Sequence, residues 1–266
     1  MKYCLFLDID GTILPFRHDD MLAITKQSIQ QAQANGVACF INTGRPTCAI
    51  PQCLKDFPFD GYCSACGGHI FYQGKEVFKE TLGLAGVNFL QNIVLNYGVH
   101  TTFEGITSNY YLQNDAFMND HLNKMPINFS KHMKPVSLPL TNDQQADILK
   151  ATLMEFDIND PWVKEAKTTY NFMTHLSFDG VGYSGELVPK HHSKAKAIEF
   201  VKTLFDEPVT TIAIGDGIND VEMLQQADIS FWMANGEPDV AQYATYKTAS
   251  VLEDGVGKAL RQLKLI

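Results

Sequence analysis

Short apolar runs and amphipathic stretches alternate at the start of the chain. The apolar run Cys4–Leu7 precedes a helical pattern over Thr25–Ala34. Asn35-Gly36 follows that pattern and suits the left-handed end of a helix. The next run, Val37–Ile41, is continuously apolar, as is typical of a parallel strand covered on both faces. These features predict a strand–helix–strand unit of a parallel sheet.

The same alternation returns toward the other end of the chain. Ser193–Phe205 has the pattern of an amphipathic helix, and Val209–Ile214 that of a buried strand. We expect a helix through Met223-Leu224 and a core strand at Phe231–Met233. Both ends are therefore predicted to build one α/β domain with a Rossmann-like parallel-sheet core.

The middle of the chain has a different, mixed pattern. A strand is expected near Ala65, then a hairpin over Ile70–Phe78 and a helix that ends at Tyr97-Gly98. The remaining predictions are strands at Val99–Phe103, Asn109–Leu112, Trp162–Lys164, Tyr170–Met173 and Leu176–Phe178, with helices at Asn114–Asn123 and Asp143–Phe156. We interpret residues 82–184 as an inserted α+β cap domain, and residues 1–81 and 185–266 as the core.

Composition narrows the class of partner. Of the 266 residues 45% are hydrophobic and 19% charged, as in a soluble globular protein, and the net charge is −9. The acidic balance argues against nucleic acid or an anionic membrane as the main partner. No apolar run has the length of a membrane span, and we expect a cytoplasmic protein that is a monomer or a weak homodimer.

The six cysteines all lie in the first quarter of the chain. Cys63 and Cys66 form one CxxC pair, but no second pair and no histidine at zinc-finger spacing accompanies it. We expect buried, reduced thiols rather than a zinc site, a redox site or a disulfide framework.

The strongest chemical signal follows the first apolar run. The sequence there is Asp8-Ile9-Asp10-Gly11-Thr12, so that Asp8 and Asp10 leave the end of a strand in the same direction. Carboxylates so placed repel each other, and a divalent cation relieves the repulsion. In open α/β sheets this edge is also where ligands bind.

Three further motifs are expected at the same sheet edge. Thr43-Gly44-Arg45 ends the second strand, Lys194 opens a helix, and Gly215-Asp216-Gly217-Ile218-Asn219-Asp220 ends a later strand. Any one motif is moderately specific, although an isolated lysine at a helix start is usually solvated and Gly-Asp-Gly alone is usually a turn. The ordered set resembles the haloacid dehalogenase superfamily, and within it the Cof-type hydrolases, which act as phosphatases on sugar phosphates and similar metabolites.

The resemblance implies roles for three aspartates. Asp8 corresponds to the nucleophile that forms an aspartyl-phosphate, and Asp10 to the general acid/base. Asp216 would hold Mg²⁺ together with the Asp8 carboxylate and the main-chain carbonyl of Asp10, because these are the hard oxygen ligands that Mg²⁺ prefers.

It also implies a phosphate-binding set around these aspartates. Thr43, the N–H of Gly44, Lys194 and Asn219 would contact the phosphoryl group, and Asp220 would orient Lys194 or a metal-bound water. For Arg45, which follows Gly44 in the motif, a structural salt bridge and a substrate contact remain open. In the inserted domain the candidate substrate contacts are Glu104, Asn109, Tyr110 and His175.

Two departures from the family pattern concern the pocket. Cys66 stands where the family often has asparagine, and Ala195 where it often has glycine. Neither removes a catalytic group. The leading hypothesis is a Mg²⁺-dependent phosphatase acting on a small phosphorylated metabolite. A phosphotransferase or mutase, and a metabolite-binding regulator without activity, are the alternatives.

Overall fold

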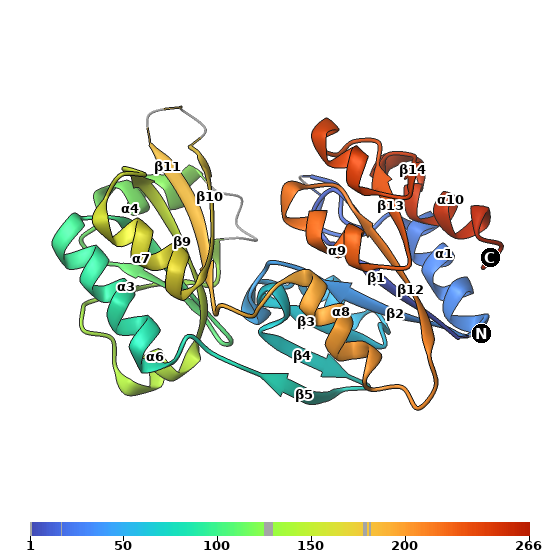
Figure 1. Ribbon diagram of the computed structural model, residues 1–266, viewed down its shortest axis with the longest axis horizontal. Helices are drawn as coiled ribbons and strands as arrows, with labels where there is room; N and C mark the ends of the chain where they lie inside the picture. Colours follow the sequence, from blue (N-terminus) through green and yellow to red (C-terminus); the bar gives the residue numbers. More distant parts are fainter. Residues whose placement is uncertain (1, 17, 125–129, 178–179, 181) are drawn as a thin grey trace. The chain divides into compact units, whose positions relative to one another are not determined.

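The computed structural model describes residues 2–16, 18–124, 130–177, 180 and 182–266. The chain forms two compact units (Figure 1). The first unit comprises Met1–Gly44, Pro51–Phe78 and Ser193–Ile266, and the second comprises Arg45–Ile50 and Lys79–His192. Each unit is described by itself.

The first unit is built on an eight-stranded sheet in the order β14-β13-β12-β1-β2-β3-β4-β5. Neighbouring strands are parallel from β14 through β3, and β4 is antiparallel to β3. The strands are β1 (Lys2–Leu7), β2 (Val37–Asn42), β3 (Gly61–Ser64), β4 (His69–Tyr72), β5 (Lys75–Lys79), β12 (Val209–Gly215), β13 (Ile229–Met233) and β14 (Tyr246–Thr248). This arrangement confirms the predicted α/β class with a parallel-sheet core.

Helices lie on both faces of this sheet. They are α1 (Ala23–Ala34), α2 (Gln52–Asp56), α8 (Lys194–Lys202), α9 (Val221–Gln226) and α10 (Gly255–Gln262), with short 3₁₀ turns at Ala65–Gly67, Ile218–Asp220, Pro238–Tyr243 and Val251–Glu253. Phe6 and Phe40 share one core with Ile198 of α8 and Met223 of α9. The alternate strand residues point to the opposite face, where α1 and α10 lie against each other. Burial on both faces explains the continuous apolar runs Cys4–Leu7 of β1 and Val37–Ile41 of β2.

The second unit contains a six-stranded sheet in the order β10-β11-β9-β6-β7-β8. Its strands are antiparallel except for the parallel pair β7–β8. The strands are β6 (His100–Gly105), β7 (Asn109–Leu112), β8 (Met133–Val136), β9 (Ile148–Phe156), β10 (Asn171–Leu176) and β11 (Tyr183–Val188); the helices are α3 (Gly83–Tyr97), α4 (Ala116–Lys124), α6 (Asn142–Asp147) and α7 (Pro161–Thr169), with a 3₁₀ turn at Thr47–Ala49. One core joins α3 and α7 to the sheet, through residues such as Leu90, Phe103 and Trp162.

Two predicted elements of this unit are wrong in type. Asp143–Phe156 was expected as one helix, but α6 ends at Asp147 and the rest is the inner strand β9. Trp162–Lys164 was expected as a strand and lies within α7, which has a proline in its first turn. Proline fits there because that position needs no intrahelical N–H donor. Of the predicted strand Leu176–Phe178, Leu176 ends β10 and Phe178 lies outside the described residues.

The borders of the second unit also differ from the expected 82–184. Its long segment runs from Lys79 to His192, and β11, which ends at Val188, belongs to it because it pairs with both β10 and β9. Arg45–Ile50 also belongs to it, and within this segment Sγ of Cys48 donates to Oδ1 of Asn109 at 3.2 Å. The sequence pattern contains no signal for the contact between Cys48 and Asn109, because these residues are far apart in the chain.

Candidate active site

Parallel strand pairing brings the first and last acidic motifs together. Leu7 of β1 pairs with Ile214 of β12, so that Asp8 and Asp216 emerge at the same edge of the sheet. The N–H of Asp8 continues the ladder by donating to the carbonyl of Ile214 at 3.1 Å. Thr43 leaves the same edge one strand further along, after β2. The site is therefore formed by loops that are far apart in the sequence.

The ammonium of Lys194 lies between two carboxylates. Its Nζ donates to Oδ1 of Asp8 and to Oδ1 of Asp220, both at 2.6 Å. Lys194 is 2% exposed, Asp8 5% and Asp220 0%, so the triad is shielded from water. Burial alone would lower the pKa of Lys194, but the two carboxylates outweigh it and the net pKa is raised. Lys194 therefore stays protonated.

The pKa of Asp8 lies above that of an ordinary exposed aspartate. Burial is the largest influence and raises its pKa to about 8, with the negative charges of Asp220 and Asp10 adding to the rise. Lys194 opposes the shift. A buried carboxyl in such a position needs further positive charge to stay ionised at neutral pH.

Asp216 is held by close main-chain packing. Its Oδ1 accepts the hydroxyl of Thr12 at 3.2 Å, and its carbonyl accepts the N–H of Glu237 at 2.9 Å. A Cβ on Gly11 would overlap Oδ2 of Asp216, and one on Gly236 would overlap its main-chain oxygen. Burial first, and then the charge of Asp220, raise the pKa of Asp216 to about 7.

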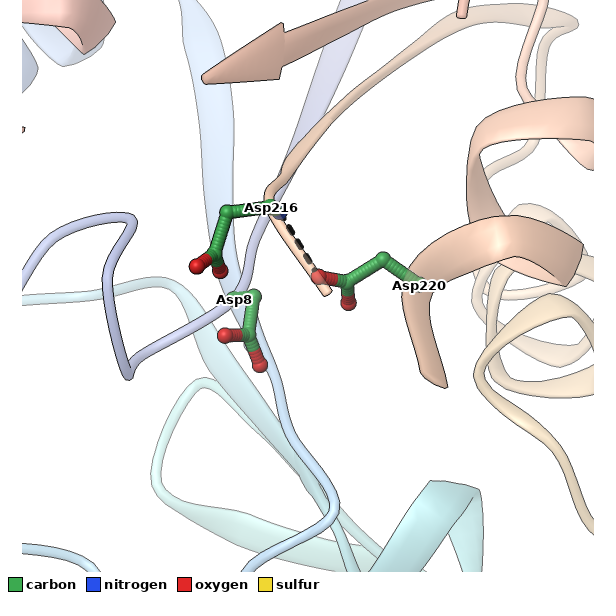
Figure 2. A group of neighbouring side chains, drawn as sticks. All are labelled: Asp8, Asp216 and Asp220. Atoms are coloured by element: carbon green, nitrogen blue, oxygen red, sulfur yellow. Dashed lines mark hydrogen bonds between the residues drawn. The ribbon is translucent and has the colours of Figure 1, made fainter. Parts of the chain in front are cut away.

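Asp220 has both carboxylate oxygens engaged. Oδ2 accepts the N–H groups of Asp216 at 2.9 Å and Gly217 at 3.1 Å, while Oδ1 accepts from Lys194. Asp220 thus closes the turn after β12 and fixes the lysine at the same time. Figure 2 shows it beside Asp216, whose N–H it binds.

The donor set fits a divalent cation. One oxygen from each of Asp8, Asp216 and Asp220 lies within 4.8 Å of the others, and the carboxylates of Asp8 and Asp216 face the same space (Figure 2). Because the oxygens of Asp220 already accept N–H donors, Asp8 and Asp216 are the pair suited to share a cation. Hard oxygens in this arrangement favour Mg²⁺ over softer metals.

The remaining predicted site residues have different environments. Asp10 is half-buried and its backbone bridges to Leu14. Thr43 and Gly44 are buried, and the N–H of Thr43 donates to the carbonyl of Cys63 at 2.8 Å. Asn219 lies beside Asp220 in the turn after β12, with its side chain exposed.

Arg45 is half-buried and belongs to the second unit. Its guanidinium donates to the carbonyl of Ala49 at 3.0 Å, within the same short segment. This bond closes the turn that follows Gly44.

The sequence analysis gave no role to three polar residues that hold the site together. Thr12 binds Asp216, as described above. Asn235 donates to the carbonyl of Gly11 at 2.8 Å and accepts the N–H of Val251 at 2.7 Å, so it links the loop after β1 to the loops after β13 and β14. Asn42 contacts the main chain of Lys194. Thr12 and Asn42 are buried and lie within or directly beside a motif, and that was the available signal. Asn235 is exposed and follows the predicted strand Phe231–Met233, so the sequence offered no such signal for it.

All six cysteines are free thiols. Cys63 is fully buried, which raises the pKa of its thiol above the usual range and makes it unreactive. Cys66 lies in a left-handed turn, with φ 55°, and is 2% exposed. Its N–H donates to the carbonyl of Thr43 at 3.1 Å, so it supports the loop that follows β2. Within the described parts of the chain, no helix has the length and apolar character needed to cross a membrane.

Comparison with known proteins identifies the family. Residues 5–260 match the model of the haloacid dehalogenase-like hydrolases, so the chain belongs to this family, as its motifs suggested. Members of the family with phosphatase names match it along nearly their whole length, and the chain is a phosphatase of this family.

Two relatives and one solved structure illustrate the match. A "Putative phosphatase" of Mycoplasma pneumoniae is 27% identical over 97% of this chain and 96% of its own. The 5-amino-6-(5-phospho-D-ribitylamino)uracil phosphatase YcsE of Bacillus subtilis is 26% identical over 96% and 93%. The solved structure of BT4131, a sugar phosphatase of HAD subclass IIB, superposes with a TM-score of 0.80 at 24% identity, covering 100% of both chains. That structural likeness shows a shared fold.

Proposed function

We propose that this protein is a Mg²⁺-dependent phosphatase that hydrolyses a small phosphorylated metabolite, such as a sugar phosphate, through an aspartyl-phosphate on Asp8. The observation that carries the proposal is the buried Asp8–Lys194–Asp220 triad with Asp216 beside it. A carboxylate nucleophile, a fixed ammonium and a cation-sized space between acids are what phosphoryl transfer to an aspartate requires.

The side chains divide the work as follows. Asp8 attacks phosphorus in line with the departing alkoxide, and Lys194 neutralises the charge that the carboxylate and the phosphoryl oxygens share. Asp10 protonates the leaving oxygen and then deprotonates the water that hydrolyses the acyl-phosphate. The hydroxyl of Thr43, the N–H of Gly44 and the amide of Asn219 bind the phosphoryl oxygens.

We assign Mg²⁺ to the carboxylates of Asp8 and Asp216, with the main-chain carbonyl of Asp10 as a further ligand. When bound, the ion offsets the repulsion between an anionic nucleophile and an anionic phosphate. Asp220 is a positioning residue, because its oxygens hold Lys194 and the turn that carries Asp216.

We further assign the second unit as the cap that selects the substrate. Of the four candidate contacts, His175 is exposed on β10. The hydroxyl of Tyr110 instead donates to Asp147 at 3.1 Å, and Glu104 is buried beside Lys150. Asn109 holds the N–H of Gly105 and the thiol of Cys48. On these contacts, His175 is the first residue to vary in tests of specificity.

We place the enzyme in the cytoplasm, as a monomer or a weak homodimer. Support for this compartment comes from the six free thiols, since a reducing environment keeps cysteines in that state.

A panel of phosphate esters tests the proposal. Phosphate release from at least one sugar phosphate with Mg²⁺, and its loss in EDTA, are the expected results. A mutase would interconvert sugar phosphates without releasing phosphate. Tight binding of an ester without any turnover would instead make the protein a metabolite sensor and would overturn the proposed hydrolysis.

A further inference from the structure

A buried amide at the end of β2 contacts the main chain that carries the catalytic lysine. Asn42 is the last residue of β2 and is 0% exposed. Its Nδ2 donates to the main-chain oxygen of Lys194 at 2.9 Å and lies 3.2 Å from Sδ of Met223. Lys194 is the first residue of α8, so the contact joins a strand end to a helix start.

The rest of this surface is apolar. Asn42 follows Phe40 on the same face of β2, and Phe40, Ala197 and Met223 belong to one buried cluster. Oδ1 of Asn42 is buried and meets no hydrogen-bond donor among the described residues. A buried acceptor without a donor destabilises the folded state, and an apolar side chain of similar size would avoid that penalty. Stability alone therefore does not account for an asparagine here.

The direction of the amide is set by its partner. The main-chain oxygen of Lys194 can only accept, so Nδ2 must face it and Oδ1 must point away. Turning the amide over would bring two acceptors together. The contact with Lys194 thus explains both the bond that Asn42 makes and the oxygen that it leaves unpaired.

The first turn of α8 is held from other directions as well. Ser193 caps it, accepting the N–H of Lys196 at 3.2 Å. The Ala65–Gly67 turn packs closely against the helix, because a Cβ at Gly67 would lie only 3.0 Å from Cβ of Ala197. The Ser193 cap and the close packing of Gly67 against Ala197 both restrain the first turn of α8. The amide of Asn42 adds a link from this turn to β2, the strand beside β1.

We infer that Asn42 is a positioning residue that fixes the main chain of Lys194 relative to β1 and β2, so that its ammonium meets Asp8. The inference rests on the proposed function of Lys194. Asn42 acts through Lys194 and touches no reacting atom. Thr43 follows Asn42 directly, so one strand end positions both a phosphate-binding residue and the lysine.

The test compares Asn42→Leu with Met223→Leu. Met223 is the other partner of the same amide, and its replacement keeps the volume of the core and the bond to Lys194. We expect Asn42→Leu to lower kcat about tenfold or more, with KM within about twofold of wild type. Its unfolding midpoint in urea should equal or exceed that of wild type. Met223→Leu should keep the wild-type kcat. If Asn42→Leu does not fold, Asn42→Ala is measured in its place with the same expectations for kcat and KM, while its unfolding midpoint should fall below that of wild type because alanine leaves a cavity.

A second measurement needs no substrate. Hydrogen exchange of the metal-free protein should be faster in the first turn of α8 in Asn42→Leu, and unchanged there in Met223→Leu, because only the former loses the anchor. Wild type that releases no phosphate from any ester contradicts the proposed function, while the exchange result still decides on Asn42. An unchanged kcat in active Asn42→Leu overturns the inference. Equal losses in both variants, or unchanged exchange in Asn42→Leu, also overturn it.

Discussion

Nζ of Lys194 lies 2.6 Å from Oδ1 of Asp8, although 186 positions separate the two residues in the sequence. Both side chains are almost completely buried. An ion pair in such a place orients the carboxylate before any substrate arrives, which lowers the reorganisation needed during reaction. Removal of Lys194 would leave two buried carboxylates without their cation, whereas removal of the Asp8 charge leaves Lys194 paired with Asp220.

Replacement of the nucleophile should abolish turnover without unfolding the protein. Asp8→Asn keeps the shape of the side chain but removes the attacking charge, so we expect kcat to fall by a factor of about 10⁴ or more. Phosphate release and circular dichroism measure the two effects. Asp206→Asn makes the same chemical change at an exposed aspartate of the first unit and should match wild type. Substantial turnover by Asp8→Asn would exclude Asp8 as the nucleophile.

Loss of the acid/base should separate the two half-reactions. In Asp10→Asn an ester with a good leaving group can still phosphorylate Asp8, but hydrolysis of the acyl-phosphate lacks its base. We expect a burst of product and a steady-state rate lower by a factor of about 10² to 10⁴. Mass spectrometry after an acid quench should find one phosphoryl group on the peptide that contains Asp8. A wild-type steady-state rate would contradict the role of Asp10.

The stability of the metal-free protein should fall as the pH rises. Burial raises the pKa of Asp8 to about 8 and of Asp216 to about 7, from a usual value of 3.8. A carboxyl whose folded pKa is raised stabilises the fold below its unfolded pKa, and this contribution is lost as the pH rises through the folded value. Stability in EDTA should therefore decline between about pH 4 and pH 8.

Mg²⁺ should reverse that decline, because it binds the ionised carboxylates. At one fixed Mg²⁺ concentration, about 100 times the Kd at pH 8, we expect Tm to rise by about 5 °C at pH 8 and by less at pH 6, where protonation of the carboxylates weakens binding. Asp216→Asn should show a smaller rise at both values. Thermal unfolding followed by circular dichroism tests this, and an equal effect of Mg²⁺ at both pH values would count against the assigned ligands.

A matched pair of glycine substitutions can isolate the packing around Asp216. Gly11 and Gly36 both have positive φ, +79° and +87°, but a Cβ on Gly11 would overlap Asp216 while one on Gly36 meets nothing within 4 Å. Alanine should cost each protein about 1–2 kcal/mol of backbone strain. Only Gly11→Ala should lower kcat, by about 100-fold, because it displaces the carboxylate. Similar kcat values for the two variants would mean that the site tolerates movement of Asp216.

Lys150 should stabilise the second unit through a buried charge cluster. Its ammonium lies 2.8 Å from Glu186 and 3.6 Å from Glu104, and Thr152 also donates to Glu104. Lys150→Met removes the cation from between two acids and should cost about 3–5 kcal/mol of unfolding free energy. Lys164→Met, at an exposed position of α7, should change it by less than about 0.5 kcal/mol.

The cost of Lys150→Met should also grow with pH. Burial raises the pKa of Glu104, and Lys150 opposes that rise. Without the lysine the pKa rises further, and stability linked to a raised carboxyl pKa is lost as the pH increases. Urea unfolding at pH 5 and pH 8 should show the larger difference at pH 8. A difference that shrinks at pH 8 would mean that Glu104 is ionised without help from Lys150.

The sequence predicted the first unit better than the second, and particular residues show why. Cys4–Leu7 of β1 and Val37–Ile41 of β2 are continuously apolar because helices cover both faces, which leaves a clear local signal. In β9 the local pattern is ambiguous. Thr141 begins a true helix with a capping box, and nothing nearby indicates that it stops at Asp147. Pairing with β6 and β11 decides the strand, and those partners are distant in sequence.

Strand β11 was missed because of its glycine. Gly185 normally weakens a strand prediction, but here a Cβ would lie 2.7 Å from the ring of Phe172 across the sheet. Only glycine leaves room for this aromatic ring.

The motif residues of the site could be found from residue type and spacing. Asn42 and Asn235 could not, because they bind main-chain atoms of residues elsewhere in the chain.

Strand β1 lies in the middle of its sheet, between β2 and β12. During translation β2 is therefore synthesised soon after β1, whereas β12 is complete only after Val209–Gly215 have been added. For most of translation the nascent chain carries an apolar strand with one open edge, a template for pairing with other chains. Chaperones that shield such edges during synthesis should matter more for this protein than for one whose central strands are consecutive.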